Sequence, residues 1–191
     1  MKKNVNCYKQ KGSTCSICSM LMILDYYKKL DIPKWYFERK YYKIYKSKYT
    51  VGTPLSAVCY HLAKNNFECK LFHSESSIFK NDGYMNKDLF DNLLSEYKEF
   101  ITLAEFKGAN VKNGVEINID LLKRYLKNNY FIILSGMVNN SLHNVLLTGY
   151  DKNNIYVCDP LYKKESIWDN KRVEEFIKTP IGSWCLMVRN D

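Results

Sequence analysis

The most constraining feature of this sequence is a change in its hydrophobic pattern near residue 130. Before that point, apolar residues recur at helical spacing in four stretches, at residues 15–30, 54–65, 86–98 and 118–128. After it, they gather in short runs rich in Val, Ile, Leu and Tyr, at residues 130–138, 142–150, 154–158 and 183–188. Helices followed by antiparallel strands predict an α+β fold, with a helical part at about 1–128 and a sheet part at about 129–191.

The length of 191 residues is that of one domain. No linker, repeat or low-complexity stretch divides the chain, so we predict a single domain over residues 1–191. Three smaller elements complete the prediction: a helix that begins at Pro33, a strand at 67–72 and a short helix at about 171–178. No run of about 18 apolar residues is present, which excludes a transmembrane helix.

The cysteines give no sign of a disulfide framework. They number seven, which is odd, and their spacing forms no obvious pairs. The basic N-terminus is not followed by an apolar segment, so we expect no secretory signal peptide. Together these observations predict a reducing, cytoplasmic setting.

The positive charge lies in the first quarter of the chain. The net charge is +9, and residues 1–50 contain twelve basic and three acidic residues, while the remainder is balanced. Such a region attracts anions, acidic peptides, nucleic acid or anionic lipid head groups. Within it, residues 34–50 alternate bases with aromatics, a composition that also occurs in single-stranded nucleic-acid sites. No strand-borne aromatic motif accompanies this segment, which disfavours a nucleic-acid partner and favours an amphipathic helix docked on the core.

Cys15 is the first candidate for chemistry. It stands at the start of the strongly apolar stretch 15–30, directly after Ser13 and Thr14, either of which could cap a helix. The partial positive charge and free N–H groups of a helix N-terminus favour a thiolate over a thiol. A cysteine in this position becomes a nucleophile when a cationic neighbour is present, although most helix cysteines are inert core residues.

His143 and Asp159 are candidates for the partners of such a nucleophile. His143 opens one predicted strand and Asp159 ends the next, with a turn at 150–154 between them. A hairpin centred on residue 151 would place the two side chains at the same level, within hydrogen-bonding reach. The carboxylate would then orient the imidazole and stabilise its protonated form. Asp159 before Pro160 could otherwise be a turn former.

Gln10 completes the candidate site. It lies five residues before Cys15, so its side-chain amide could join the Cys15 backbone N–H in stabilising an oxyanion. Each of the four residues is a weak signal by itself. Together, a nucleophile at a helix start, a base at a strand end and a carboxylate across a hairpin indicate nucleophilic cysteine catalysis.

These segments resemble the papain-like double-glycine leader peptidases, which process bacteriocin precursors. The resemblance rests on Gln10 with the helix CSICSMLMILDY at 15–26, and on HNVLLTGYD at 143–151 with DPL at 159–161. The turn GTP at 52–54 is similar to that of the stand-alone relatives. In the family pattern a glycine follows the nucleophile, where this chain has Ser16, and Gln10 is one residue closer to the cysteine than in many members. Residues 66–117 match no part of the pattern.

The resemblance implies a papain-like fold, in which a buried nucleophile helix packs on the antiparallel sheet. It also implies a cysteine peptidase with Cys15 as nucleophile, His143 as base, Asp159 as orienting carboxylate and Gln10 as oxyanion donor, and without a metal or cofactor. The substrate would be a leader or precursor peptide. The basic N-terminal region would favour an acidic peptide. Export would require a separate transporter.

Several alternatives remain open at this point. The same four residues could perform acyl or amide transfer to an acceptor other than water, or the chain could be an inactive relative that binds peptides. Cys15 and Cys18 form a Cys-x-x-Cys pair, which in other settings is a redox motif or half of a zinc site. No predicted strand precedes this pair, and no second pair of ligands has suitable spacing.

Overall fold

The computed structural model describes residues 2–75, 86–139, 141–179 and 181–190. Within these ranges the chain forms six helices and seven strands. In chain order they are α1 (Cys15–Tyr26), α2 (Lys34–Tyr45), α3 (Leu55–Lys64), β1 (Glu68–His73), α4 (Lys87–Phe106), β2 (Asn110–Lys112), α5 (Ile119–Lys127), β3 (Phe131–Val138), β4 (Ser141–Tyr150), β5 (Asn154–Cys158), β6 (Glu165–Asp169), α6 (Asn170–Phe176) and β7 (Trp184–Arg189).

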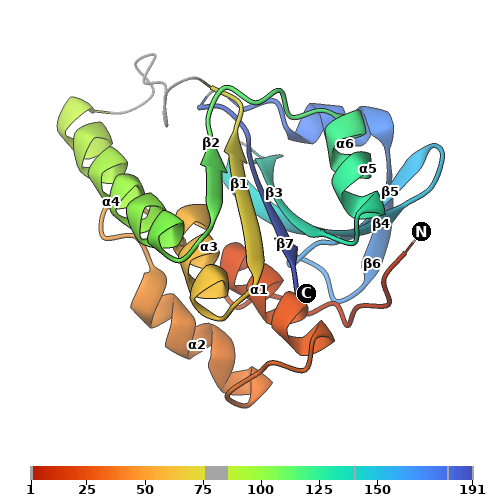
Figure 1. Cartoon of the computed structure of the whole chain (residues 1–191), viewed down its shortest axis with the longest axis horizontal. Coiled ribbons are helices and arrows are strands. Elements are labelled where there is room, and N and C mark those ends of the chain that lie inside the picture. The colour runs from red at the N-terminus through yellow and green to blue at the C-terminus, as the bar shows by residue number, and fades with distance from the viewer. Residues whose placement is uncertain (1, 76–85, 140, 180, 191) are drawn as a thin grey trace.

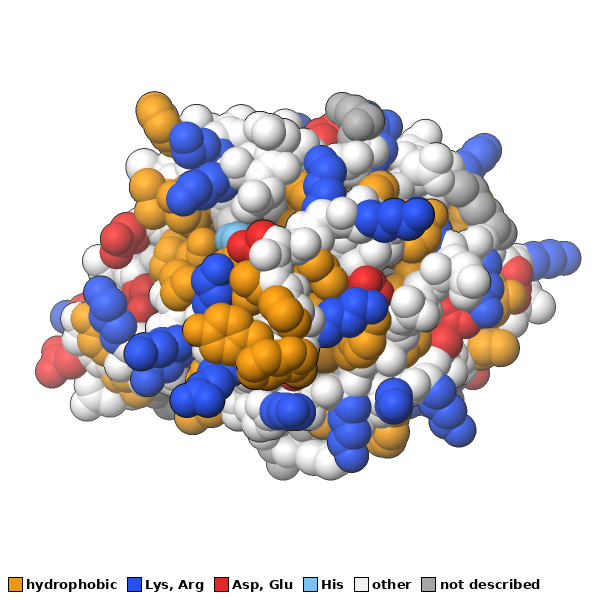
Figure 2. All heavy atoms as spheres, turned by 90° about the horizontal axis from the view of Figure 1, so that it is seen from below, with side chains coloured by type: hydrophobic (Ala, Val, Ile, Leu, Met, Phe, Trp, Pro, Cys, Tyr) orange, Lys and Arg blue, Asp and Glu red, His pale blue; other side chains and the backbone are white. Residues whose placement is uncertain are grey.

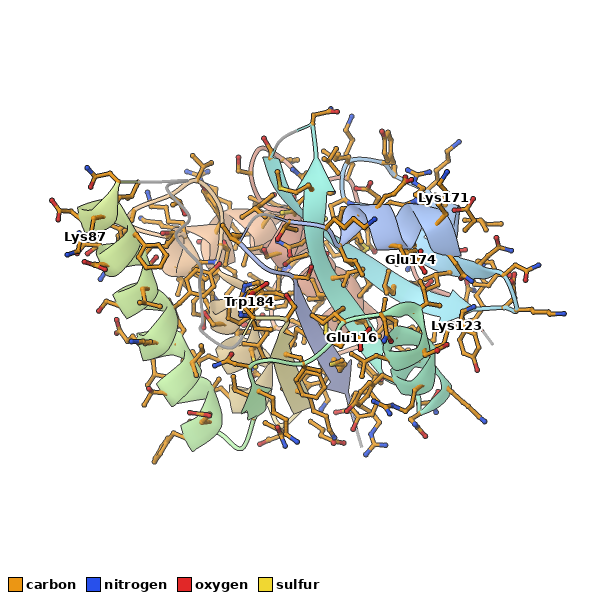
Figure 3. The ribbon with its side chains drawn as sticks, turned by 90° about the horizontal axis from the view of Figure 1, so that it is seen from above. Lys87, Glu116, Lys123, Lys171, Glu174 and Trp184 are labelled. Carbon is orange, nitrogen blue, oxygen red and sulfur yellow. A yellow bond between two sulfur atoms is a disulfide. The ribbon has the colours of Figure 1, made fainter. Side chains whose placement is uncertain are left out.

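The seven strands form one sheet, in the order β2-β1-β7-β3-β4-β5-β6. Helices cover both faces of this sheet, so the molecule has three layers: Figure 1 shows α5 and α6 on one side and α1 to α3 on the other. In the view from above (Figure 3), Lys123 on α5 and Lys171 on α6 project outward, while Trp184 lies in the interior at the start of β7. The α+β prediction is confirmed.

Strand β3 shows why the sheet needs both helical layers. Its residues Phe131 and Ile133 face the core shared with α1 and α3, while Ile132 and Leu134 face the core shared with α5 and α6. All four side chains are fully buried. A strand covered on both faces has a continuous apolar run rather than an alternating one, which is what the sequence contains here.

The sheet differs from the prediction in the strands that form it and in their directions. It is not confined to the C-terminal part, because β1 and β2 come from the part expected to be helical, and β1 pairs with β7. It is also not wholly antiparallel, since β1 and β2 run parallel. Strands β2 and β6 were not predicted: β2 has only three residues and β6 has one buried side chain, so neither has a readable period.

Two predicted helices have different ends in the structure. The stretch 15–30 is helical only to Tyr26, because Lys28 adopts a left-handed conformation with φ of 55° and ends α1. The stretch 86–98 extends to Phe106 in α4, where Asn86 caps the first turn by accepting hydrogen bonds from the N–H groups of Asp88 and Leu89. Within the described ranges, no helix has the length and apolar character needed to span a membrane.

A disulfide joins Cys7 to Cys158 and contradicts the expectation that no cysteines pair. It fastens the N-terminal segment to the end of β5. The same segment is held near β4, where the N–H of Lys3 donates to the carbonyl of Thr148 at 2.9 Å. Disulfides persist mainly in oxidising compartments, so this bond does not support the predicted reducing setting.

Reduction of this disulfide should destabilise the fold. The bond closes a loop with a sequence separation of 151 residues, and its loss increases the conformational freedom of the unfolded chain. We expect the free energy of unfolding to fall by about 2–4 kcal/mol in urea titrations with reductant. The Cys7→Ala variant should show the lower stability with or without reductant. Seven titratable thiols in the oxidised, unfolded protein would contradict the prediction.

Candidate active site

Cys15 is the first residue of α1, a helix that is buried over most of its length. Every residue from Ser16 to Leu24 is buried, because the apolar side chains surround the helix and both the sheet and the other helices pack against it. The sequence predicts that Ser13 or Thr14 caps α1. Thr14 occupies the N-cap position, but its side chain forms no capping hydrogen bond. Its hydroxyl instead donates to Glu38 Oε1 on α2 at 2.7 Å. The free N–H groups at the N-terminus of α1, next to Cys15, are therefore not occupied by a side-chain acceptor from the N-cap residue.

His143 and Asp159 form a buried pair beside this helix start. The distance from His143 Nε2 to Asp159 Oδ1 is 2.7 Å, and the two residues are 5% and 3% exposed. The same carboxylate oxygen accepts the backbone N–H of Leu161 at 2.9 Å, which fixes its orientation. The imidazole is thus held by a group that can stabilise its protonated form.

The strand register behind this pair differs from the prediction. Leu146 pairs with Cys158 and Leu147 with Val157, and a β-bulge follows between Leu147 and Gly149. Continuing this register would place Asp159 opposite residue 145 rather than opposite His143. The predicted level pairing is therefore wrong, and the two side chains meet along a diagonal, within the reach of neighbours on one face of a sheet.

Cys15 and His143 lie close enough for each to alter the pKa of the other. Because Nε2 of the ring faces Asp159, Nδ1 is the nitrogen available to the sulfur. Burial acts to raise the pKa of the Cys15 thiol, but His143 and donors from Asn144 outweigh it and leave the pKa below its ordinary value. Burial likewise acts to lower the pKa of His143, while bonds and charges from Asp159 and Cys15 raise it to about 9. This combination favours a thiolate–imidazolium pair near neutral pH.

Gln10 lies near this group, but its side-chain amide is turned elsewhere. Its backbone N–H donates to the carbonyl of Pro160 at 2.7 Å, so the residue runs beside the Asp159-Pro160 turn. Its side-chain Nε2 donates to the carbonyl of Gly12 at 2.6 Å. The structure therefore brings Cys15, His143 and Asp159 into one cluster, in which His143 bonds to Asp159 and interacts electrostatically with Cys15. It places Gln10 beside this cluster, with its amide directed to the local backbone.

The sequence analysis missed Asn144. Its side-chain Nδ2 lies 3.5 Å from Cys15 Sγ and 2.9 Å from Ser16 Oγ. The available signal was a polar residue directly after the candidate histidine, at the start of the apolar run Val145-Leu146-Leu147. Side-chain alternation along a strand directs neighbouring residues to opposite faces, so the pattern gives no reason to expect Asn144 and His143 at one sulfur.

Cys18 does not behave as the second residue of a redox pair. It is buried one turn inward on α1, where its Sγ lies 3.2 Å from the carbonyl of Tyr8, and burial raises its pKa. Among the described residues, no group of three His, Cys, Asp or Glu side chains is arranged to hold a metal ion.

A groove of about 600 Å³ lies between α2 and the segment that precedes α1, and Thr14, the residue before Cys15, is part of its lining. One face of α2 docks on the core through Phe37, Tyr41 and Tyr45, as an amphipathic helix would. The other face lines the groove with aromatic and basic side chains; its lining residues are Lys11, Thr14, Trp35, Glu38, Arg39, Tyr42, Lys43 and Lys46. Figure 2, which views the molecule from below, shows hydrophobic side chains interspersed with many Lys and Arg on this side.

Comparison with solved structures finds a similar fold in a double-glycine motif protease from an AMS/PCAT transporter, solved in complex with its leader peptide. The TM-score is 0.56 and the identity 16%, over 100% of this chain and 94% of that one. A putative C39-like peptidase from Bacillus anthracis has a TM-score of 0.43 and 13% identity, over 99% of both chains. The first of these likenesses confirms the papain-like fold predicted from the sequence.

Among curated proteins, the comparison finds no match. The family model described as the Peptidase_C39 like family matches residues 2–189, which is nearly the whole chain. With the fold and the Cys15, His143 and Asp159 cluster already described, this match identifies the chain as a member of the Peptidase_C39 like family.

Proposed function

We propose that the protein is a cysteine peptidase with Cys15 as nucleophile, His143 as general base and acid, and Asp159 as the residue that orients the imidazole. The observation that supports this most directly is the buried His143–Asp159 hydrogen bond, with His143 close enough to Cys15 to lower the pKa of its thiol. Membership of a peptidase family supports the same class of reaction. The arrangement fulfils the requirement that a nucleophile contacts a base which a third group orients.

The reaction would proceed in two steps. The Cys15 thiolate attacks the carbonyl carbon of the peptide bond, and His143 gives its proton to the leaving amine, which departs to leave a thioester. His143 then takes a proton from water, the resulting hydroxide attacks the thioester, and the carboxylic acid product leaves as the thiolate–imidazolium pair is restored. The Cys15 backbone N–H, with the Gln10 amide after rotation from Gly12, would stabilise the oxyanion in each step.

The substrate would be a leader or precursor peptide that docks in the groove along α2, which reaches Thr14 next to Cys15. The structural neighbour is a protease bound to a leader peptide, which supports a peptide substrate. The groove contains four basic side chains, on Lys11, Arg39, Lys43 and Lys46, against one acidic side chain, on Glu38. Such a surface favours acidic peptides by attracting opposite charge. A separate export transporter as partner remains part of this proposal, whereas the Cys7–Cys158 disulfide does not favour the predicted cytoplasmic setting.

Removal of either reacting group should abolish turnover. We expect Cys15→Ala and His143→Ala to reduce cleavage of a fluorogenic peptide to background, and Asp159→Asn to slow it by roughly 10³–10⁴-fold through the wrong tautomer. Cys18→Ala, one turn along the same helix, is the matched control and should retain activity. Circular dichroism establishes that each variant is folded. Turnover by a folded Cys15→Ala variant would refute the mechanism.

The pH dependence of kcat/KM should be bell-shaped, with a broad maximum. Activity should rise as Cys15 ionises, which occurs below the usual range of a thiol because its pKa is lowered. It should fall as the pH passes about 9, where His143 loses the proton that the leaving amine requires. The same profile measured on an ester substrate, whose leaving group needs less protonation, should fall less steeply. A maximum confined to pH values above 9 would contradict the ion-pair assignment.

Charge reversal in the groove should weaken acidic substrates selectively. For Arg39→Glu and Lys43→Glu we expect KM for an acidic peptide to rise by about tenfold, with little change in kcat. The effect should shrink as salt is added, because exposed charges are screened over about 10 Å. Lys171→Glu, exposed on α6 and outside the groove lining, is the matched control. An equal rise in KM for a neutral peptide would show that the variants disturb the site rather than the charge recognition.

A further inference from the structure

The side chain of Asn144 is directed at the sulfur of the candidate nucleophile. Its Nδ2 lies 3.5 Å from Cys15 Sγ. Asn144 directly follows His143 on β4, so two consecutive residues of this strand act on the same sulfur, and both lower the pKa of the thiol. The proposed peptidase mechanism uses only His143.

The surrounding hydrogen bonds determine which end of the Asn144 amide faces the sulfur. Ser16 Oγ donates its single proton to the carbonyl of Thr53 at 2.9 Å. It must therefore act as an acceptor toward Asn144, so the group 2.9 Å from it is the donor Nδ2. On the other side, Ser135 Oγ donates to Asn144 Oδ1. Ser16 and Ser135 together hold the amide with its N–H₂ group toward Cys15.

Burial of the sulfur makes these donors necessary. A charged thiolate loses water when it is buried, and a donor that bonds to the charged form recovers part of that loss. The Asn144 amide is neutral and held in place before the reaction, so it needs no rearrangement when the thiolate forms. Gln10, the other amide near the site, is bonded to Gly12.

We propose that Asn144 is a further catalytic residue, whose side-chain amide stabilises the Cys15 thiolate, with Ser16 and Ser135 as the residues that position it. This inference rests on the proposed function, because it assumes that the Cys15 thiolate is the nucleophile. It assigns Asn144 to the attacking sulfur, whereas Gln10 is assigned to the oxyanion.

The test measures the rate of alkylation of Cys15 by iodoacetamide across a pH range, read by peptide mass spectrometry. This rate follows the thiolate fraction and needs no substrate. In Asn144→Asp an acceptor with negative charge replaces the donor, so the titration of Cys15 should move alkaline by about one pH unit or more. Labelling near pH 6 should then slow by about tenfold or more. Asn144→Ala removes the donor without adding charge and should shift the titration in the same direction, by less.

Two further variants separate positioning from general disturbance. Ser16→Ala frees the amide to rotate and should shift the titration of Cys15 to more alkaline pH, by less than Asn144→Asp does. This variant keeps the proposal testable if the aspartate variant fails to fold. Asn110→Asp, exposed on the edge strand β2, adds the same charge away from the site and should leave the titration unchanged.

The outcomes distinguish the two proposals. Rapid labelling of wild-type Cys15 with an unchanged titration in Asn144→Ala and Ser16→Ala would overturn the role of Asn144 and leave the peptidase proposal intact. Labelling of wild-type Cys15 no faster than that of the buried Cys18 would overturn both. A merely structural role of Asn144 would lower thermal stability without moving the titration, and would also refute the inference.

Discussion

The site depends on one contact, the approach of the N-terminus of α1 to β4. This contact brings the Cys15 sulfur within reach of His143 and Asn144, two consecutive residues of β4. It is maintained by the burial of α1 on nearly all sides, which leaves the helix no freedom to turn or slide. Packing of α1 therefore fixes the position of Cys15. The neighbouring side chains on β4 need only have the right hydrogen-bonding chemistry.

The electrostatics of the site follow from the same burial. Removal of water opposes the thiolate on Cys15 and the imidazolium on His143 alike. Each charged form is favoured because the other lies beside it, because Asp159 stabilises the ring from behind and because Asn144 donates to the sulfur. The two groups therefore depend on each other, and a change to either one alters the protonation of both.

Much of this site could be predicted from the sequence, and the error in the predicted register of β4 and β5 shows why. The sequence placed His143 directly opposite Asp159, whereas the register of β4 and β5 places Asp159 nearer the level of residue 145. A shift of two residues keeps a side chain on the same face of a sheet, whereas a shift of one would move it to the other. The contact between the two side chains therefore survives the wrong register. The error lies in the turn, because Tyr150 pairs with Ile155 and the hairpin is centred between residues 152 and 153 rather than on residue 151.

Features that depend on distant parts of the chain were less accessible. The Cys7–Cys158 disulfide joins residues far apart in sequence, and an odd cysteine count gives no indication of the pair. Strand β2 is too short to have a period and is defined by its pairing with β1. Alternation along β4 predicted opposite directions for His143 and Asn144, yet both contact Cys15, because the sulfur lies where the helix end meets the strand.

Ser16 and Asn144 are best understood together. The resemblance to leader peptidases places a glycine after the nucleophile, and a glycine has no hydroxyl that could accept a bond from Asn144. With Ser16 present, the amide of Asn144 gains an acceptor beside the sulfur, and Ser16 itself is anchored to the carbonyl of Thr53. A buried serine without such partners would be costly, and a buried asparagine more so. The two polar residues satisfy each other, and their pairing directs a hydrogen-bond donor toward the reacting atom.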